Sequence, residues 1–370
     1  MNFLKKVILT IVTLSIVVSL SLAFTGCPPA APTEEATEVE ETTEKEEEEA
    51  ETEEEEPIKV ALLFSGFLGD QSFNDSAYAG IQRAVDDFGI EVKVFESKEP
   101  AVWEQNVVSA ADANYDLVLC VSTNFQEFIK DHAPEFPDVK FALIDGIVED
   151  EPNVSSAVFA NNEGCFLSGL VAAMWTTKTE ISGVNEDKII GFVSGMDIPV
   201  VHDFLKGYEQ GARLIEPDIE VLVSWAGSWT DPVKGKELTL AQYNQGADVV
   251  MNVASGTGPG ILEAASEAGK YAIGVDLNQD GLFPGSIITS LLKRVDNACY
   301  VTVKSVIDGT FKGGTVVDMN LTNGGVSLTD FSVMKENMGD AFPEDVITTV
   351  EEYIQKVING EIIVEGEPGF

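Results

Sequence analysis

Short apolar runs recur along residues 57 to 370 and alternate with segments long enough to form helices. The runs are continuous and rich in Val, Ile and Leu, which is typical of strands that are buried on both faces of a parallel sheet. Because helix-length segments separate them, the pattern predicts an α/β fold. The expected strands cover residues 59–64, 91–95, 116–121, 140–145, 188–193, 220–225, 248–253 and 271–276.

The strand pattern occurs twice along the chain. Residues 59–66 match residues 188–195 in register, and residues 90–92 match residues 219–221 at the same offset of 129. This repeat predicts two Rossmann-like lobes in tandem. Ligands of open α/β sheets bind outside the carboxyl ends of the strands, so we expect a cleft between the lobes that is lined by the loops after the strands.

Each lobe places one large aromatic side chain in such a loop. Phe73 lies in GDQSFND (69–75), which we expect to lead into a helix near Ser76, and Trp229 lies in GSWTDP (227–232). Each ring either packs in the core of its lobe or stacks on a ligand. Their matching positions leave these alternatives equal, and as a pair the rings would clamp a planar group.

Charged side chains also follow the predicted strands. Asp145 and Asp276 each end an apolar strand, and ionised carboxylates suit a donor-rich partner such as paired sugar hydroxyls. The alternative is that each aspartate caps the next helix. Lys293 and Arg294 form the only adjacent basic pair in residues 57 to 370, and they either face the cleft or lie on the helix that follows.

A glycine-rich turn around Gly256 follows the strand at 248–253, and Asp276 comes 20 residues later. This arrangement is similar to a dinucleotide site, but its glycine spacing is not GxGxxG, and the strand is not the first of its lobe. We therefore interpret the turn as a place where the backbone approaches a ligand closely.

The sequence offers little for catalysis or metal binding. It contains neither HExxH nor GxSxG, and its two histidines, His132 and His202, do not combine with a nucleophile and an orienting group. Cys120, Cys165 and Cys299 lie singly in apolar stretches, without a CxxC pair, and are interpreted as buried hydrophobic residues. We expect a binding protein without metal or cofactor.

The charge of the chain is strongly negative. The chain of 370 residues has 22 Lys and Arg against 63 Asp and Glu, a net charge of -41 at neutral pH. Such a charge repels polyphosphate, so nucleic acid is excluded as a partner. Residues 28–56 hold fifteen of the glutamates with one lysine and are expected to form a disordered spacer. Residues 57 to 370 still carry 48 acidic against 19 basic residues.

The first residues have the pattern of an export signal. Lys5 and Lys6 precede an apolar run from Val7 to Phe24, and small residues then lead to Cys27. The TGC sequence resembles a bacterial lipobox, in which Cys27 is lipidated and becomes the mature N-terminus. The alternative is an uncleaved anchor, because the apolar run is just long enough to span a bilayer. Both alternatives place the folded lobes outside the cytoplasm.

Several motifs together resemble the basic membrane protein family of substrate-binding lipoproteins, whose members similar to the purine nucleoside receptor serve ABC importers. The motifs are GDQSFND (69–75), ALIDG (142–146), NNEGCFLSGLVAA (161–173), GFVSGMDIPVVHDFLKGYEQGA (191–212), WAGSWTDPVKGKELTLAQYNQGADVV (225–250), SGTGPGILEAASEAGKYAIGVDLNQ (255–279) and TSLLKRVD (289–296). The resemblance implies a type I periplasmic-binding fold with a three-stranded hinge. It implies a signal peptide at 1–26, a lipidated tether at 27–56, lobe 1 at 57–158 plus about 288–320, and lobe 2 at 159–287 plus about 321–370.

The resemblance also implies a function and a set of ligand contacts. We expect a monomeric, lipid-anchored receptor that binds a nucleoside, with a purine base, and delivers it to an ABC permease. Phe73 and Trp229 would stack on the base, Asn74 would contact base or sugar, and Asp145 and Asp276 would hold the ribose hydroxyls. Lys293 would make a polar contact, and Met196 and Gly256 would approach the ligand closely.

Other ligands stay open at this point. Phe64 stands where receptors of this kind often carry Asp, so a sugar or an autoinducer is an alternative ligand. An enzyme that processes nucleosides or NAD is an alternative from another class, and turnover of an added nucleoside would identify it.

The leader generates a prediction about anchoring. Cys27→Ala removes the thiol that the lipobox would lipidate, so the full-length protein should leave the membrane fraction while its ligand affinity stays the same. Fractionation of cells followed by immunoblotting measures this. A variant that stays firmly bound to the membrane would favour the uncleaved anchor.

Overall fold

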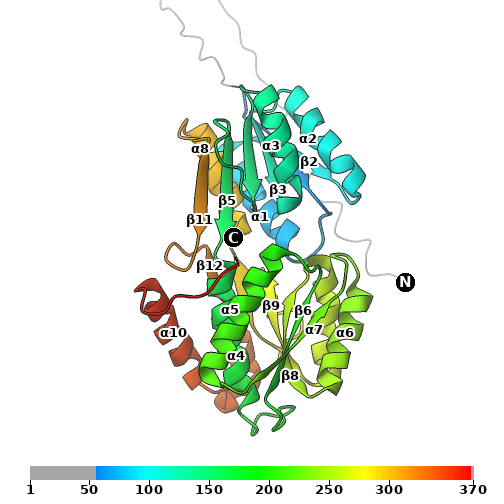
Figure 1. Ribbon diagram of the computed structural model, residues 1–370, viewed down its shortest axis with the longest axis vertical. Helices are drawn as coiled ribbons and strands as arrows, with labels where there is room; N and C mark the ends of the chain where they lie inside the picture. Colours follow the sequence, from blue (N-terminus) through cyan, green and yellow to red (C-terminus); the bar gives the residue numbers. More distant parts are fainter. Residues whose placement is uncertain (1–55, 368–370) are drawn as a thin grey trace, which may run out of the picture. The chain divides into compact units, whose positions relative to one another are not determined.

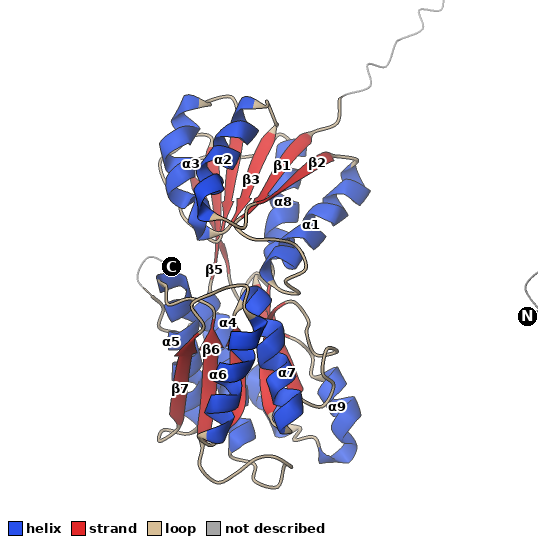
Figure 2. Ribbon diagram, turned by 90° about the vertical axis from the view of Figure 1, so that its right-hand side faces the viewer, coloured by secondary structure: helices blue, strands red, loops and turns tan. Residues whose placement is uncertain are grey.

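Two sheets form the framework of the computed structural model, which describes residues 56–367. These residues fall in a single compact unit, and its two sheets have six strands each (Figures 1 and 2). In lobe 1 the strand order is β11-β5-β4-β3-β1-β2, and in lobe 2 it is β12-β10-β9-β8-β6-β7. The matching order, with the first strand of each lobe next to the edge strand, agrees with the repeat in the sequence.

The strands of lobe 1 are β1 (Lys59–Phe64), β2 (Glu91–Glu96), β3 (Leu117–Val121), β4 (Lys140–Ile144), β5 (Val154–Phe159) and β11 (Thr315–Met319). Those of lobe 2 are β6 (Ile189–Ser194), β7 (Glu220–Trp225), β8 (Ala247–Val253), β9 (Tyr271–Asp276), β10 (Ile287–Lys293) and β12 (Val326–Leu328). The pairs are parallel except β10 with β12, which is antiparallel.

The helices around the sheet of lobe 1, called sheet 1, are α1 (Phe73–Phe88), α2 (Trp103–Asp112), α3 (Gln126–His132) and α8 (Val295–Ile307). Those of lobe 2 are α4 (Asn161–Thr176), α5 (Pro199–Ile215), α6 (Pro232–Asn244), α7 (Gly258–Ala268), α9 (Ser332–Met338) and α10 (Asp345–Ile358). None of the helices among residues 56–367 combines the length and the hydropathy that crossing a bilayer would require.

Alternate residues of the first strand serve two separate cores. In β1, Val60 and Leu62 pack toward α1 and α8, whereas Ala61 and Leu63 pack toward α2 and α3 on the other face. Successive side chains of a strand point to opposite faces, so helices on both faces require a strand without polar positions. Figure 2 shows this arrangement, with α2 and α3 on one side of the sheet and α1 and α8 on the other. The continuous apolar runs of the sequence have this cause.

The chain crosses between the lobes at three places. It leaves sheet 1 after β5, returns after β10 and leaves again after β11. Backbone hydrogen bonds tie the crossings together, from Ala160 N to Met319 O at 2.9 Å and from Arg294 N to Gly325 O at 2.9 Å. The return follows Lys293, rather than residue 288, because β10 pairs with β9 and so belongs to sheet 2.

Helices α4 and α5 pack unusually closely beneath the crossings. A Cβ atom at Gly207 would lie 2.0 Å from the carbonyl oxygen of Asn162, and one at Gly211 would lie 2.0 Å from that of Phe166. Only glycine leaves room for this contact between backbones. The contact fixes α5, whose first turns face the other lobe.

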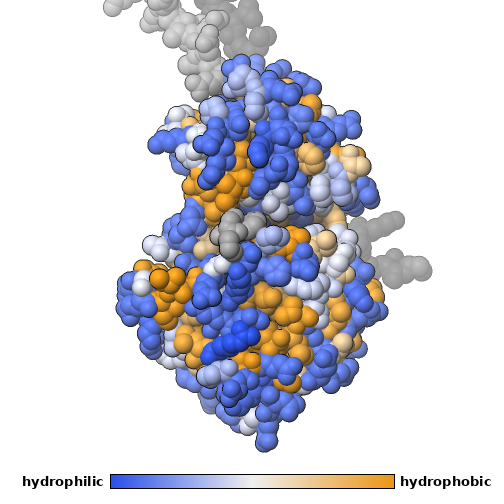
Figure 3. Space-filling view, viewed as in Figure 1, coloured by the Kyte–Doolittle hydropathy of each residue, from blue (hydrophilic) through white to orange (hydrophobic). Residues whose placement is uncertain are grey.

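The surface agrees with the composition of the chain. On the face drawn in Figure 3, hydrophilic residues cover most of both lobes and hydrophobic ones form smaller areas. The leader, Cys27 and nearly all of the acidic tether lie outside the described residues, so the expectations for them stay predictions.

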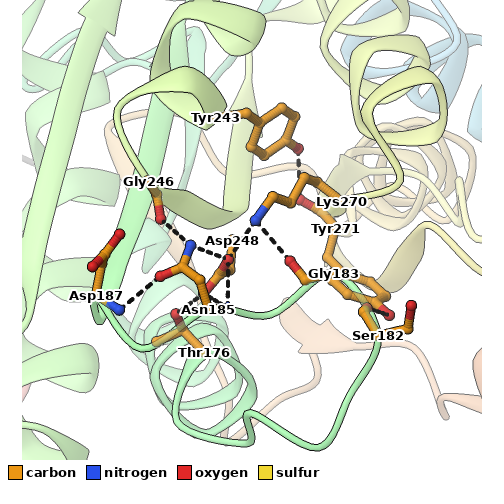
Figure 4. Close-up of polar contacts among 10 residues, drawn as sticks. All are labelled: Thr176, Ser182, Gly183, Asn185, Asp187, Tyr243, Gly246, Asp248, Lys270 and Tyr271. Carbon is orange, nitrogen blue, oxygen red and sulfur yellow. Dashed lines mark hydrogen bonds and ion pairs between the residues drawn. The ribbon is translucent and has the colours of Figure 1, made fainter.

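A buried aspartate organises the end of lobe 2 that lies farthest from lobe 1. The Asp248 carboxylate, at the start of β8, is fully buried and accepts hydrogen bonds from Lys270 Nζ (2.7 Å), Thr176 Oγ1 (2.7 Å) and Asn185 Nδ2 (2.8 Å) (Figure 4). Lys270 Nζ also donates to the Gly183 carbonyl at 2.7 Å. The cluster therefore fixes the loop between α4 and β6.

This cluster generates a stability prediction. Lys270→Met leaves the buried Asp248 carboxylate without its charged partner and should lower the free energy of unfolding by about 2 to 4 kcal/mol. Urea denaturation measures the change. Lys304→Met breaks an exposed pair with Asp308 and should change it by less than about 0.5 kcal/mol. Equal stability of the two variants would contradict the role of the cluster.

Candidate ligand-binding cleft

A cleft of about 660 Å³ lies between the two lobes, at the carboxyl ends of both sets of strands. It takes loops after β1, β2, β3 and β4 from lobe 1, and loops after β6, β7, β8 and β9 from lobe 2. Seven of the eight residues proposed from the sequence line it: Phe73, Asn74, Asp145, Met196, Trp229, Asp276 and Lys293. The repeat in the sequence therefore located the cleft correctly.

Lys293 lies at the hinge end of the cleft and is 2% exposed. Its Nζ donates to Asp145 Oδ1 at 2.7 Å, and it lies 5.2, 4.9 and 5.2 Å from the ring centroids of Phe73, Phe159 and Phe204. A buried ammonium needs such partners because its desolvation is costly. Arg294 points elsewhere and pairs with Asp296 at 2.8 Å. Of the two basic residues, Lys293 is thus the one in the cleft.

Asp145 and Asp276 occupy equivalent positions in the two lobes. Both have a left-handed backbone, with φ of 68° and 66°, and neither caps the helix that follows it, α4 or α8. Asp276 accepts a hydrogen bond from the Ser72 hydroxyl of the other lobe. Burial raises the pKa of Asp276 to about 6, although Lys293 and Ser72 act in the opposite direction. A carboxylate kept in a place that disfavours its charge is typical of a functional site.

The two aromatic side chains are half-buried, and each has one side on the core of its lobe. Phe73 is the first residue of α1, which begins before Ser76. The Trp229 ring lies against Gly195, where a Cβ atom would be 2.2 Å from Trp229 Cε3. Thr257 fixes the Trp229 loop, because its hydroxyl donates to Ser228 O and accepts from Asp231 N, both at 2.9 Å. Both rings thus combine core packing with a surface in the cleft.

The remaining proposed residues differ in position. Asn74 is nearly buried and donates from Nδ2 to the Phe67 carbonyl at 3.2 Å, and Met196 lines the lobe 2 side. Gly256 lies beside the cleft rather than in its lining. A Cβ atom there would be 3.0 Å from the Trp229 carbonyl oxygen and 3.6 Å from Phe67 Cζ, so the glycine permits contact between protein loops.

The structure adds cleft residues that the sequence interpretation missed. Asp70 is 1% exposed, and burial raises the pKa of its carboxyl group. Phe67 and Trp103 add aromatic surface in lobe 1, and Phe204 adds it in lobe 2. Asp70 lies in the GDQSFND motif that drew attention to Phe73, so a signal was present. Phe204 lies inside a helix, where its spacing indicates only a core position.

The chemistry of the cleft suits binding. Its lining contains three buried or nearly buried carboxylates, from Asp70, Asp145 and Asp276, against the single buried ammonium of Lys293. Carboxylates accept hydrogen bonds and disfavour anions, so a neutral ligand with several donors and a planar group fits best. His202 is partly exposed and pairs with Asp197 at 2.6 Å, outside the lining.

Comparisons with known proteins agree over both lobes. Residues 58–367 match a family described as ABC transporter substrate-binding protein PnrA-like. The ABC transporter nucleoside-binding protein BmpA of Lactococcus lactis subsp. cremoris is 33% identical over 282 residues, 70% of this chain and 78% of the relative. Basic membrane protein A2 of Borrelia garinii subsp. bavariensis is 31% identical over 312 residues, 83% of this chain and 88% of the relative.

A solved structure has the same architecture. The crystal structure of ABC transporter system solute-binding proteins from Aeropyrum pernix K1 superposes with a TM-score of 0.79 and 32% identity, and covers 84% of this chain and 94% of that one. The type I periplasmic-binding fold expected from the motifs is thereby confirmed.

The raised pKa of Asp276 generates a prediction about stability and pH. An unfolded Asp loses its proton near pH 3.8, whereas the folded protein holds that of Asp276 up to about pH 6, so this group should lower stability as pH rises through that window. Asp276→Asn removes the effect and should stabilise the protein above pH 6 by up to about 3 kcal/mol. Chemical denaturation between pH 4 and 8 measures this.

The matched control is Asp86→Asn, which removes an exposed carboxylate of α1 that does not line the cleft. A profile of Asp276→Asn that follows the wild type through the whole range would contradict the assignment of the shift to Asp276.

Proposed function

Since the chain belongs to the PnrA-like family of ABC transporter substrate-binding proteins, we propose that its cleft binds a nucleoside and delivers it to an ABC permease. The observation that carries this proposal is the combination of two aromatic surfaces, Phe73 and Trp229, with the Asp145, Asp276 and Lys293 cluster in one cleft. The rings suit a base and the cluster suits a ribose. The relative from Lactococcus lactis, described as nucleoside-binding, supports the same ligand class.

The magnitudes are sufficient for a transport receptor. Stacking of a base contributes ~1 to 3 kcal/mol per aromatic face, and each hydrogen bond to a charged group contributes ~1.5 to 3 kcal/mol. Two faces and two such bonds sum to about 5 to 12 kcal/mol. The costs of association and ordering reduce this sum, so a binding free energy of about -8 kcal/mol, a Kd near micromolar, lies at its favourable end. Stronger hydrogen bonding within the closed cleft would lower the Kd further.

A neutral nucleoside fits better than a nucleotide or NAD. A phosphate group would meet the carboxylates of Asp70, Asp145 and Asp276. Lys293 is the only buried lysine of the lining that offsets them, because Lys98 is exposed. The negative charge of a phosphate would be repelled by these carboxylates, above all where burial keeps out the water that would screen the repulsion. We therefore expect the receptor to select nucleosides against their phosphates.

A second ligand class has one observation in its favour. Phe64 is fully buried in the lobe 1 core and contributes no polar group to the cleft at the position where such receptors often carry Asp. Because this polar contact is replaced, a sugar or an autoinducer is the second candidate ligand. Direct comparison of nucleosides with their free sugars and bases separates the two classes.

The proposal includes a location and a partner. The export signal and the Cys27 lipobox support a lipid-anchored receptor outside the cytoplasm, and the family supports an ABC permease as partner. The purine preference also belongs to the proposal, because a bicyclic base would cover more of the two aromatic surfaces than a pyrimidine.

The aromatic pair generates the first test. Phe73→Ala and Trp229→Ala each remove one stacking surface and should weaken nucleoside binding by ~1 to 3 kcal/mol, roughly fivefold to a hundredfold. Calorimetric titration with inosine, guanosine and adenosine measures the affinity, and a thermal melt measures the stability. Phe95→Ala is the matched control, because Phe95 packs on Tyr115 away from the cleft and should affect stability rather than affinity.

The opposite pattern would contradict the clamp. If Phe73→Ala and Trp229→Ala lower the melting temperature and leave the affinity unchanged, the two rings are core residues. Asp276→Asn should weaken nucleosides more than their free bases, because it replaces a charged acceptor for ribose hydroxyls. Conversion of the added nucleoside into a product during the same titrations would show that the protein is an enzyme and would contradict the receptor function.

A further inference from the structure

The segment from Gly69 to Asp75, here named the tongue, is held rigid by its own two aspartates. Asp75 accepts hydrogen bonds from the backbone N–H groups of Gly69 and Gln71, at 2.7 and 2.8 Å. Asp70 accepts from three backbone N–H groups, those of Ser72 (3.0 Å), Asn74 (2.9 Å) and Asp75 (3.1 Å). These bonds tie the tongue to the first residues of α1.

Lobe 2 presents a second preformed structure, the socket of Ser255, Asp276 and Gln279. The Gln279 side chain accepts from Val275 N at 2.9 Å, and its backbone N–H donates to Ser290 Oγ at 3.0 Å. Gln279 is 1% exposed. These bonds lie within lobe 2, so they hold Gln279 in place independently of lobe 1.

Three hydrogen bonds join tongue and socket, and two of them form a reciprocal pair. Ser72 of lobe 1 donates to Asp276 of lobe 2, and Ser255 of lobe 2 donates to Asp70 of lobe 1, the latter at 2.8 Å. Gln279 Nε2 adds a bond to the Gln71 carbonyl at 2.8 Å. Each serine therefore binds a carboxylate of the other lobe.

We propose that Ser72 and Ser255 are positioning residues that latch the two lobes together, and that the latch orients Asp276 for the ligand. The first part stands on the bonds between the lobes, and the second rests on the nucleoside function proposed above. Ser72 occupies Oδ2 of Asp276, which leaves Oδ1 as the oxygen available to a ligand donor. Closure and ligand binding thus use the two oxygens of one carboxylate.

The latch also explains the burial of two acids that the lobes would otherwise expose. Ser72 is fully buried, and Asp70 and Asp276 are nearly so. Both acids line the cleft, so separation of the lobes would return them to water and break two bonds to charged acceptors. The closed state is therefore held by contacts that belong to the protein itself.

Hydrogen–deuterium exchange of the full chain without ligand tests the latch. Ser72→Ala and Ser255→Ala each remove one donor from opposite lobes. Each should raise exchange about tenfold in both the segment 67–78 and the segment 274–284, because one bond to a charged group is lost between them. Ser156→Ala is the matched control. Its buried hydroxyl bonds Val148 within lobe 1, so exchange should change only near that site.

The outcomes separate the latch from a local structural role. A rise confined to the lobe that carries the substitution, in both serine variants, would overturn the proposal. A rise in both lobes supports it, even if wild-type protein binds no nucleoside, in which case only the proposed ligand fails. If nucleoside binds, Ser72→Ala should raise its dissociation rate about tenfold with little change in the association rate. An unchanged dissociation rate would overturn the role of Ser72 in orienting Asp276.

Discussion

The buried ion pair of Lys293 with Asp145 is the interaction on which the rest of the cleft depends. Lys293 ends β10, the last strand before the chain returns to lobe 1, and its ammonium reaches a carboxylate of lobe 1. Rings from both lobes surround it. Removal of Lys293 would leave the buried carboxylates of Asp145 and Asp276 without their ammonium, and the loss of one partner of a buried ion pair is among the most costly changes in a folded protein. The pair thus fixes the hinge end of the cleft.

The Lys293 ammonium also favours the charged form of the buried carboxyl groups around it. Burial raises the pKa of Asp276, and the positive charge of Lys293 opposes this rise. Lys293 opposes the effect of burial on the pKa of Asp203 in the same way, together with the hydrogen bonds that Asp203 accepts from the backbone N–H groups of Asn162 and Glu367. The cleft lining holds the carboxylates of Asp70, Glu99, Asp145 and Asp276 against the ammonium groups of Lys98 and Lys293, so hydrogen-bond acceptors stay in excess. This excess is the physical reason for proposing a neutral ligand with several hydrogen-bond donors, and it opposes phosphates.

Much of this architecture could be predicted from the sequence, and the failures have physical causes. The strands with continuous apolar runs were expected, whereas β5, with Ser155 and Ser156, and β10, with Thr289 and Ser290, were not. Their buried hydroxyls are satisfied by partners outside the strand, such as Val148 N for Ser156 and Thr329 for Thr289. A local pattern contains no information on such partners.

The residues of the cleft also divide into those that the sequence predicts and those that it does not. Phe73, Trp229, Asp145 and Asp276 follow strands, so the repeat alone brings them to one cleft. Adjacent Lys293 and Arg294 could not be distinguished, since their directions depend on the last residue of β10 and the start of α8. The bonds of Ser72 and Ser255 to the opposite lobe depend on the docking of two separate sheets, which no periodicity describes.

The central claim is that the cleft holds an intact nucleoside. Mass spectrometry of the ligand that co-purifies with the full-length protein from its native cells tests this most directly, because the protein itself selects among the available compounds. The account predicts a nucleoside of unaltered mass, without phosphate. A free sugar, an autoinducer or a cleaved base as the bound compound would contradict it.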